Sequence, residues 1–345
     1  MPTTADRLPG RQEPATPRVR AVTATRYGGP EVVEVGTRPA PSAPGPGQVR
    51  LRVEAVGLAA GDVALLQGRP LVVRTAFGLR RPRQPLLGRD VAGIVDAVGT
   101  DVTDLAPGDR VHGEVTTGAL AEQVLVAADQ LVRRPAELTA VEAGVLPVSG
   151  ATALQGLRDA GRLRAGQHVL VHGASGGVGH LAVQIARAFG AEVTGVAGPA
   201  NLALVRELGA HDTVDHTTTD PFAVRGRYDL VFDLVGDRPL AEMRRSLRPG
   251  GAVVLAAGGG GPVLGPLGRI AVALATGPFV RARLRPLAAS CRRDDLETLR
   301  TMIDAGDLRP RVARTFPLAR AREAYAAQLA GTVRPKLAIE VPASG

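Results

Sequence analysis

HVLVHGASGGVGHLAVQIARAF, residues His168–Phe189, predicts a strand, a glycine-rich turn and a helix in direct succession. Val169–Val171 is a short apolar run, typical of a buried parallel strand. Apolar residues then recur at spacings of three and four, on one face of a helix: Val178, Leu181, Ala182, Ile185, Ala186 and Phe189. A strand, a turn and a helix in this order indicate a mononucleotide-binding unit.

The turn between that strand and helix is where we expect a dinucleotide to bind. Glycines let the backbone approach a diphosphate, and a helix N-terminus offers free N–H groups to it. Against the pattern G-x-G-x-x-G, Gly176 and Gly179 are in place and Ala174 replaces the first glycine. The expected contact residues are Ala174, Ser175, Gly176, Gly177, Val178 and Gly179. A tight turn without a ligand is the alternative, but the β–α alternation that follows favours binding.

The composition is that of a globular protein of two domains. The chain has 345 residues, of which 45% are hydrophobic and 22% charged. No apolar run approaches the ~18 residues of a membrane span, and residues 1–17 are polar and rich in proline. We therefore expect a disordered extension at residues 1–17, a cytoplasmic location and no membrane partner.

The net charge of +9 raises the question of a nucleic-acid partner. The arginines are scattered, with short clusters at Arg80–Arg83 and Arg292–Arg293, and aromatic residues make up only 3% of the chain. No platform for base stacking is visible, so we expect no nucleic-acid partner. The single cysteine, Cys291, excludes an internal disulfide and a multi-cysteine metal site.

The pattern of strands and helices divides the chain into three parts. Up to about residue 135, short strands alternate with Gly, Pro and Asp turns, among them an expected alternating strand at Glu31–Val35, which predicts a β-barrel-like domain. From about Leu146, strands alternate with helices, as in a doubly wound parallel sheet. After residue 292, the pattern predicts two helices and two strands.

Six short motifs, in this order, carry a resemblance to a known family: Tyr27–Glu31 (YGGPE), Gly88–Gly93 (GRDVAG), Pro107–Asp109 (PGD), Leu146–Ala153 (LPVSGATA), Ala174–Gly179 and Leu208–Ala210 (LGA). The chain resembles the zinc-independent quinone-oxidoreductase branch of the medium-chain dehydrogenase/reductase superfamily. The resemblance implies an α/β fold in which a doubly wound Rossmann sheet is inserted into a GroES-like, β-barrel-type catalytic domain. The expected parts are the GroES-like domain at 18–145, the Rossmann domain at 146–291 and a C-terminal segment at 292–345 that completes the catalytic domain.

Zinc-dependent members of that family carry an early cysteine and a Gly-His-Glu motif. Here the corresponding stretches read Leu58–Asp62 (LAAGD) and Gly88–Asp90 (GRD), which supply no thiolate or imidazole. We therefore expect no metal site. An asparagine that often precedes the aspartate in quinone reductases is also absent, since Ala59 and Ala60 stand there.

The resemblance implies a reductase that uses NADPH to reduce an electrophilic acceptor, such as a quinone or an α,β-unsaturated carbonyl. It places Thr152, Leu234, Val235, Gly258 and Gly259 beside the cofactor. Asp62 is the candidate catalytic residue, with a turn or an arginine pair as the alternative role for its carboxylate. Two other functions stay open: a zinc-free alcohol dehydrogenase or biosynthetic reductase of the same fold, and a non-catalytic NADPH sensor. A homodimer is the expectation from the family.

NADPH rather than NADH is expected because no Asp or Glu follows the second strand of the unit, where NAD-selective sites carry one. That strand ends in Gly195–Asn201 (GVAGPAN). The candidates for binding the 2′-phosphate are Asn201, His216, Arg334 and Lys336. We favour Arg334 because a guanidinium binds phosphate in a bidentate way.

Overall fold

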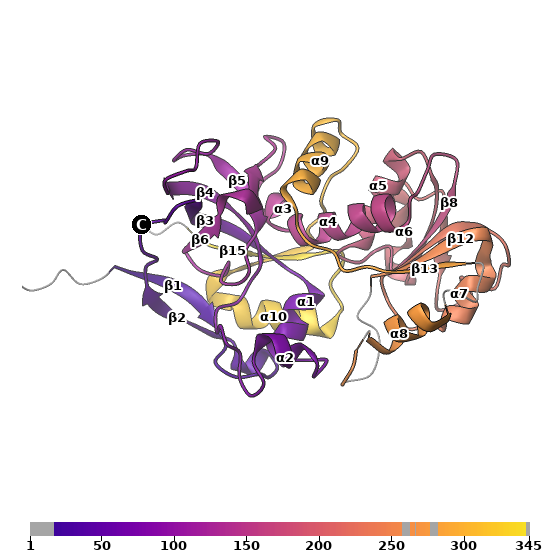
Figure 1. The fold of residues 1–345 in the computed structure, drawn as a ribbon, viewed down its shortest axis with the longest axis horizontal. Helices are drawn as coiled ribbons and strands as arrows, with labels where there is room; N and C mark the ends of the chain where they lie inside the picture. Colours follow the sequence, from indigo (N-terminus) through magenta and orange to yellow (C-terminus); the bar gives the residue numbers. More distant parts are fainter. Residues whose placement is uncertain (1–16, 257–262, 266, 277–281, 343–345) are drawn as a thin grey trace, which may run out of the picture.

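The fold has two halves, one built on a parallel sheet and one on a mostly antiparallel sheet (Figure 1). A computed structural model describes residues 17–256, 263–265, 267–276 and 282–342. The expected extension at residues 1–17 thus lies almost wholly outside the described residues.

The parallel sheet has six strands in the order β10-β9-β8-β11-β12-β13, with every neighbouring pair parallel. The order reverses between β8 and β11, and in such sheets ligands bind at the carboxyl ends of the strands at this point. The strands are β8 (His168–His172), β9 (Glu192–Ala197), β10 (Asp212–Asp215), β11 (Tyr228–Asp233), β12 (Leu247–Leu255) and β13 (Arg283–Pro286).

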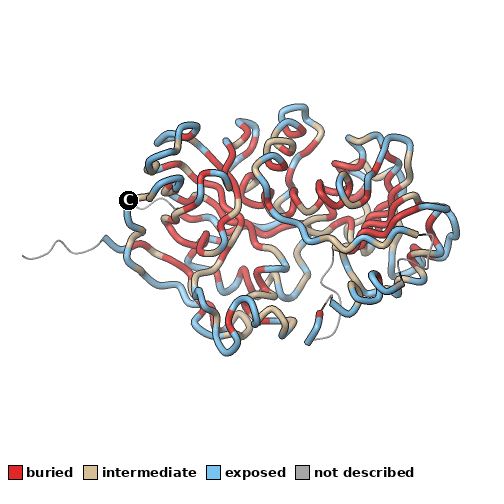
Figure 2. The backbone as a smooth tube through the Cα atoms, viewed as in Figure 1, coloured by how far each residue is buried: buried red, intermediate tan, exposed pale blue. Residues whose placement is uncertain are grey.

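Helices cover both faces of this sheet, as expected of a doubly wound fold. In β8, Val169 and Val171 enter one hydrophobic cluster and Leu170 enters another, because successive side chains of a strand point to opposite faces. The four inner strands of this sheet, β9, β8, β11 and β12, are largely buried (Figure 2). The helices of this half are α4 (Pro147–Gln155), α5 (Gly179–Ala188), α6 (Leu202–Glu207), α7 (Leu240–Ser246) and α8 (Leu267–Thr276).

The other half corresponds to the domain that is expected to be catalytic, and we call it the catalytic half. It is built on a seven-stranded sheet in the order β14-β15-β3-β4-β5-β7, with β6 also paired to β3. A separate hairpin of β1 and β2 joins it through the bridge Ala21–Ala121. The strands are β1 (Arg18–Thr23), β2 (Glu34–Pro39), β3 (Gln48–Leu58), β4 (Asp90–Val98), β5 (Arg110–Glu114), β6 (Gln123–Ala127), β7 (Leu131–Arg133), β14 (Arg314–Pro317) and β15 (Leu337–Glu340). Its helices are α1 (Ala60–Gln67), α2 (Val73–Phe77), α3 (Ala140–Gly144) and α10 (Ala321–Ala330).

The C-terminal segment is divided between the two halves, which differs from the expected boundary at residue 292. β14, α10 and β15 join the catalytic half. Helix α9 (Arg293–Asp304) packs instead on α4, and its Leu296 and Leu299 belong to the core of the parallel sheet. Gln155 Nε2 donates to Asp295 Oδ2 at 2.6 Å, which fixes the start of α9 against α4.

The expected strand at Glu31–Val35 is only partly correct. Pro30–Val32 forms a turn of 3₁₀ helix, and the strand β2 begins at Glu34. Proline in the first position of the turn has the backbone angle that a helical turn requires. The proline therefore outweighs the alternation of Glu and Val, and the first residues of the expected strand form a helical turn instead.

Within the described residues, none of the helices combines the length and the apolar character that crossing a bilayer requires.

Candidate functional site

The turn between β8 and α5 requires glycine at two positions, Gly173 and Gly179. Gly173 has φ +92°, a conformation that L side chains rarely adopt. A Cβ at Gly179 would lie 2.1 Å from the carbonyl oxygen of Gly173, so helix and strand pack too closely for any side chain. The first glycine of the turn is therefore Gly173 and not the position of Ala174, and the spacing G-x-x-G-x-x-G is the signal that the sequence analysis missed.

The backbone of this turn fits an anion. Within the described residues, the N–H groups of Ser175, Val178 and Gly179 donate no backbone hydrogen bond. A Cβ at Gly176 would meet only the carbonyl oxygen of Gly173, at 3.2 Å, so its outer side is otherwise open. Free N–H groups at the start of a ten-residue helix match the diphosphate of a dinucleotide.

His180, in the first turn of α5, fixes the position of the glycine turn. Its Nδ1 lies 3.0 Å from the carbonyl oxygen of Gly176, and its Nε2 accepts from the backbone N–H of Arg311 at 3.2 Å. These partners require a proton on Nδ1 and none on Nε2. Burial lowers the pKa of His180 to about 4, so the ring is neutral at pH 7. This role of His180 was not predicted from the sequence, because Arg311 is 131 residues away along the chain.

Two of the candidates for the 2′-phosphate lie after neighbouring strands of the sheet. Asn201 ends the short turn that follows β9, and His216 follows β10. The backbone N–H of His216 donates to the carbonyl oxygen of Ala197, and a Cβ at Gly198 would stand 3.5 Å from His216 Nε2. The His216 ring therefore lies beside the end of β9.

Lys336 and Arg334 lie in other surroundings. Lys336 is buried, with Nζ 3.0 Å from Ser149 Oγ and 3.5 Å from Asp90 Oδ2. Its stem lies against Gly177, where an added Cβ would stand 2.9 Å from Cδ. This corrects the expectation for Lys336, because a buried ammonium paired with a carboxylate is not available to a ribose phosphate. Arg334 is exposed, and its guanidinium lies near the C-terminal end of α10.

Asp233 shapes the loop after β11, which contains the expected cofactor residues Leu234 and Val235. Its Oδ1 accepts from the backbone N–H groups of Val235 and Gly236 at 3.2 and 3.0 Å, and lies 3.1 Å from His172 Nδ1. Burial raises the pKa of Asp233, but these bonds outweigh it and hold the pKa below its usual value. The loop is therefore held at the point where the strand order reverses.

Arg269 of α8 completes this arrangement, since its guanidinium lies 2.8 Å from Asp233 Oδ2.

The expected cofactor residues Gly258 and Gly259 lie outside the described residues. Thr152, in α4, donates its hydroxyl hydrogen to the carbonyl oxygen of Val148 at 2.6 Å. Its oxygen keeps lone pairs that are able to accept a further hydrogen bond.

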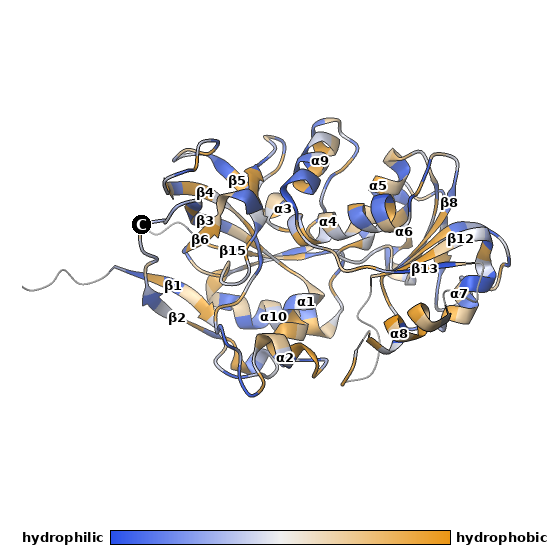
Figure 3. Cartoon of the chain, in the orientation of Figure 1, coloured by the Kyte–Doolittle hydropathy of each residue, from blue (hydrophilic) through white to orange (hydrophobic). Residues whose placement is uncertain are grey.

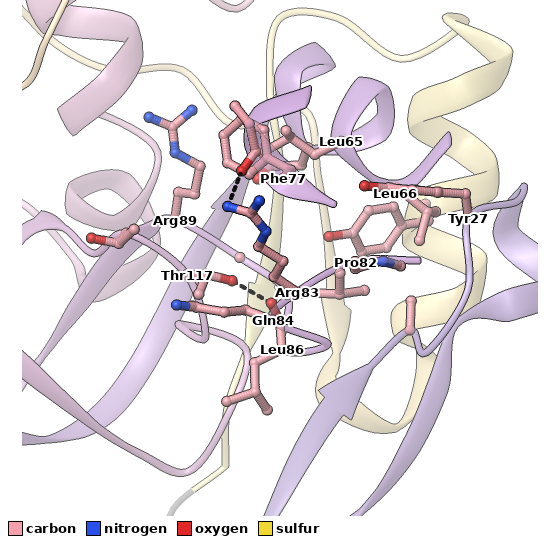
Figure 4. Close-up of a pocket in the computed structure, with 17 residues that line it drawn as sticks. Tyr27, Leu65, Leu66, Phe77, Pro82, Arg83, Gln84, Leu86, Arg89 and Thr117 are labelled. Atoms are coloured by element: carbon pink, nitrogen blue, oxygen red, sulfur yellow. Dashed lines mark hydrogen bonds between the residues drawn. The ribbon is translucent and has the colours of Figure 1, made fainter. Parts of the chain in front are cut away.

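A cavity of about 290 Å³, which we call the α1 cavity, lies in the catalytic half (Figure 4). Its side chains converge from α1, α2, α10, the loop before β4 and the loop after β5. The apolar walls are Ala24, Leu65, Leu66, Ala76, Phe77, Pro82, Leu86 and Leu87. The polar lining residues are Tyr27, Asp62, Arg83, Gln84, Arg89, Thr116, Thr117 and Tyr325. A cavity that combines apolar walls with polar groups in this way is typical of a site for a small organic molecule.

Asp62 is the acidic residue of the α1 cavity. It is 6% exposed, and its Oδ2 accepts from the backbone N–H of Ala59 at 2.8 Å. Burial raises the pKa of Asp62 to about 6, and the charge of Asp90 adds to this rise. The alternative arginine pair is not present, because among the described residues Asp62 takes part in no ion pair.

Tyr325, on α10, contributes a second polar group to the α1 cavity. The side chain is 1% exposed, and within the described residues its hydroxyl has no hydrogen-bond partner. A buried hydroxyl without a partner costs free energy, about 1–3 kcal/mol. A ligand with a polar atom in the cavity would satisfy it.

The residues at the positions of the family's zinc ligands have other partners. Arg89 is ion-paired with Glu114, and Asp90 with Lys336. Among the residues that the structure describes, no group of three His, Cys, Asp or Glu side chains is placed to hold a metal ion.

Two family profiles match the chain. The profile described as an alcohol dehydrogenase GroES-like domain matches residues 45–136, and the one described as a zinc-binding dehydrogenase matches residues 208–339. The first match lies in the catalytic half. The second begins at the end of α6 and ends in β15.

Relatives and solved structures agree with these profiles. The chain is 32% identical to the chloroplastic quinone-oxidoreductase QR1 of Triphysaria versicolor, over 93% of this chain and 98% of that protein. The quinone oxidoreductase of Coxiella burnetii has a similar structure, with a TM-score of 0.82, 28% identity, and coverage of 94% of this chain and 100% of that one.

Other relatives are longer than this chain. It is 39% identical to the polyketide synthase protein NorB of Streptomyces orinoci, over 66% of this chain and 10% of NorB. It is 38% identical to the synaptic vesicle membrane protein VAT-1 homolog of Rattus norvegicus, over 69% of this chain and 59% of that protein. The full-length match to QR1 decides the assignment. The chain is an NAD(P)H-dependent oxidoreductase that belongs to the quinone-oxidoreductase-like branch of the medium-chain dehydrogenase/reductase superfamily.

Proposed function

We propose that the chain is a zinc-independent reductase that uses NADPH to reduce quinones or α,β-unsaturated carbonyls. The observation that carries this proposal is the α1 cavity, whose apolar walls contain a protonatable carboxyl, Asp62, and an unpartnered hydroxyl, Tyr325. Such a cavity suits a flat, apolar acceptor with a carbonyl oxygen. The names of QR1 and of the Coxiella burnetii structure support a quinone as one acceptor.

Each part of the parallel sheet has a role in binding NADPH. The turn from Ala174 to Gly179 receives the diphosphate on its free N–H groups. His216 and Asn201 lie where the adenosine ribose and its 2′-phosphate are expected, beyond β9. Thr152 and the loop at Leu234 and Val235 position the nicotinamide, which when bound supplies a hydride equivalent to the acceptor.

Asp62 is proposed as the proton donor when the acceptor is an α,β-unsaturated carbonyl. With a pKa of about 6, part of the Asp62 population is protonated near neutral pH, which suits a general acid. The hydroxyl of Tyr325, which has no partner among the described residues, is proposed to donate a hydrogen bond to the carbonyl oxygen of the acceptor. A quinone has less need of Asp62, because solvent protonates its reduced oxygens.

The test is NADPH oxidation, followed by absorbance, with a panel of quinones, enones and alcohols. Turnover of quinones or enones is the expected result. Oxidation of alcohols with NADP⁺ alone would favour the dehydrogenase alternative, and tight NADPH binding without turnover would favour the sensor. Asp62→Asn is expected to lower kcat for an enone by about 100-fold and to change kcat for a quinone much less. Equal losses with both acceptors would contradict the role of Asp62 as the proton donor.

A homodimer in the cytoplasm completes the proposal. β13 is the edge strand of the parallel sheet, and a parallel-sheet edge is a surface on which a second copy is able to add its own strands. Sedimentation analysis of the purified chain tests the dimer. A monomer at micromolar concentration would contradict it.

A further inference from the structure

Large apolar side chains are exposed together on α2, on the loop after α2 and around α8. Leu79 is 71% exposed and Leu274 65%. Other side chains in or next to these segments that are more than two fifths exposed include Leu71, Phe77, Val263 and Leu264. We call these six residues the apolar face. Exposed apolar surface of this extent on a folded protein indicates contact with a partner.

The segments that carry the apolar face touch each other, although they are far apart in the sequence. The backbone N–H of Val72 donates to the carbonyl oxygen of Val263 at 3.1 Å. Gly265 lies so close to Pro70 that an added Cβ would stand 2.3 Å from Cγ. Both α2 and α8 lie along the lower edge of the molecule, and α8 is predominantly apolar (Figures 1 and 3). The apolar face is thus shared by the two halves.

The loop beside the apolar face is strongly basic. Arg80, Arg81 and Arg83 are exposed, and among the described residues none of them is paired with a carboxylate. Elsewhere on the surface, arginines such as Arg50 and Arg133 have an acidic partner at 2.6 and 2.7 Å. The sequence shows the same bias, since positions 63–89 and 243–293 contain no Asp or Glu at all. These two segments therefore supply no carboxylate to neutralise the positive charge of the basic loop.

We propose that this side docks on the surface of an anionic lipid bilayer, with the apolar face in the headgroup–acyl boundary and the arginines on the lipid phosphates. Apolar side chains next to unpaired arginines are the combination that such a surface binds. A second copy fits less well, because a two-fold contact would bring two basic loops together. This departs from the sequence-based expectation of no membrane partner, which rested on spanning segments. Phe77 also lines the α1 cavity, so docking brings the cavity next to the bilayer.

The experiment is co-sedimentation of the full chain with vesicles of phosphatidylcholine, alone or with roughly a third of phosphatidylglycerol. Binding to the anionic vesicles only, weakened by salt, is the expected result. Leu79→Glu/Arg80→Glu should lower the vesicle affinity by about tenfold or more, because it removes an apolar contact and reverses a charge. The matched control is Val224→Glu/Arg225→Glu, an adjacent apolar and basic pair exposed on the other half, which should stay within about twofold of wild type.

Leu264→Glu/Leu274→Glu tests the same face from α8 and its preceding loop, and thermal unfolding confirms that each variant is folded. None of these residues lines the α1 cavity or the glycine turn, so NADPH binding should be unchanged, and a failed reductase assay would leave the docking result intact. A wild-type chain that stays in the supernatant would overturn the proposal. Equal binding by the face variants and the control, or a face that instead holds two copies together in solution, would also overturn it.

Discussion

In the turn between β8 and α5 the backbone itself forms the binding surface, whereas side chains form the walls of the α1 cavity. At Gly179 no side chain fits, because the carbonyl oxygen of Gly173 occupies the space of a Cβ. In the cavity the lining is made of side chains, among them Leu66, Phe77, Asp62 and Arg89. Substitutions of Gly179 in the turn are therefore not tolerated, whereas side chains that line the cavity are able to be exchanged for others.

This difference separates the binding of the diphosphate, which all dinucleotides share, from the recognition of one particular acceptor. A diphosphate is the same in every dinucleotide, so a fixed array of N–H groups serves it. An acceptor is recognised by shape and by a few polar atoms, such as the Tyr325 hydroxyl. Changes in the turn should abolish binding, and changes in the cavity should alter which acceptor is reduced.

The largest expected effect comes from the turn. Gly179→Val should abolish NADPH binding and lower the melting temperature, since the backbone oxygen at 2.1 Å is unable to move aside. Gly176→Val should also abolish binding, but with little loss of stability, because a Cβ there meets one atom at 3.2 Å. Fluorescence titration with NADPH and thermal unfolding measure the two effects.

The control for these variants is Gly36→Val, on β2, where an added Cβ has nothing within 4 Å. It should bind NADPH as wild type does. Normal NADPH binding by Gly179→Val would mean that the turn has another purpose.

The next effect concerns the cavity and depends on pH. The pKa of Asp62 is about 6 in the folded chain and near 3.9 in an unfolded one, so the folded state holds this proton more tightly. The ionised carboxylate then destabilises the fold fully above pH 6, and the penalty disappears as the pH falls toward 4. Asp62→Asn should raise the free energy of unfolding by about 2–3 kcal/mol at pH 7.5 and by almost nothing at pH 4. Denaturant unfolding across this range measures the difference, and a difference independent of pH would contradict it.

The third effect concerns the preference for NADPH over NADH, which depends on residues beyond β9. Without an acid after β9 nothing repels a 2′-phosphate, and one charged hydrogen bond is worth ~1.5–3 kcal/mol, so kcat/KM should favour NADPH by about 10- to 100-fold. His216→Ala should reduce this preference, because the ring lies beside Gly198 at the end of β9. Arg334→Ala tests the residue favoured from the sequence. Steady-state kinetics with both cofactors decides, and an equal or higher kcat/KM with NADH would contradict the assignment.

The same contrast explains what the sequence could predict. The order of β8, the turn and α5 is encoded locally, in a glycine spacing and an apolar period, and it was predicted to within a few residues. The placement of Lys336 was not, because it depends on contacts with Asp90 and Ser149, which lie 246 and 187 residues away along the chain. The division of the C-terminal segment was missed for the same reason: α9 carries an apolar face, but its partner α4 is far away in the sequence.

The smallest expected effect is that of a metal chelator. Any zinc in this fold would lie near Arg89. The nearby carboxylates already have cationic partners, because Glu114 is ion-paired with Arg89 and Asp90 with Lys336. The one thiol, Cys291, is buried, and burial raises its pKa well above the usual range, so it is not a thiolate ligand at neutral pH. Treatment with EDTA should therefore change kcat by less than about twofold, and Cys291→Ser should respond in the same way. Metal analysis showing about one zinc per chain, lost together with activity, would contradict this and would place the cavity among metal sites after all.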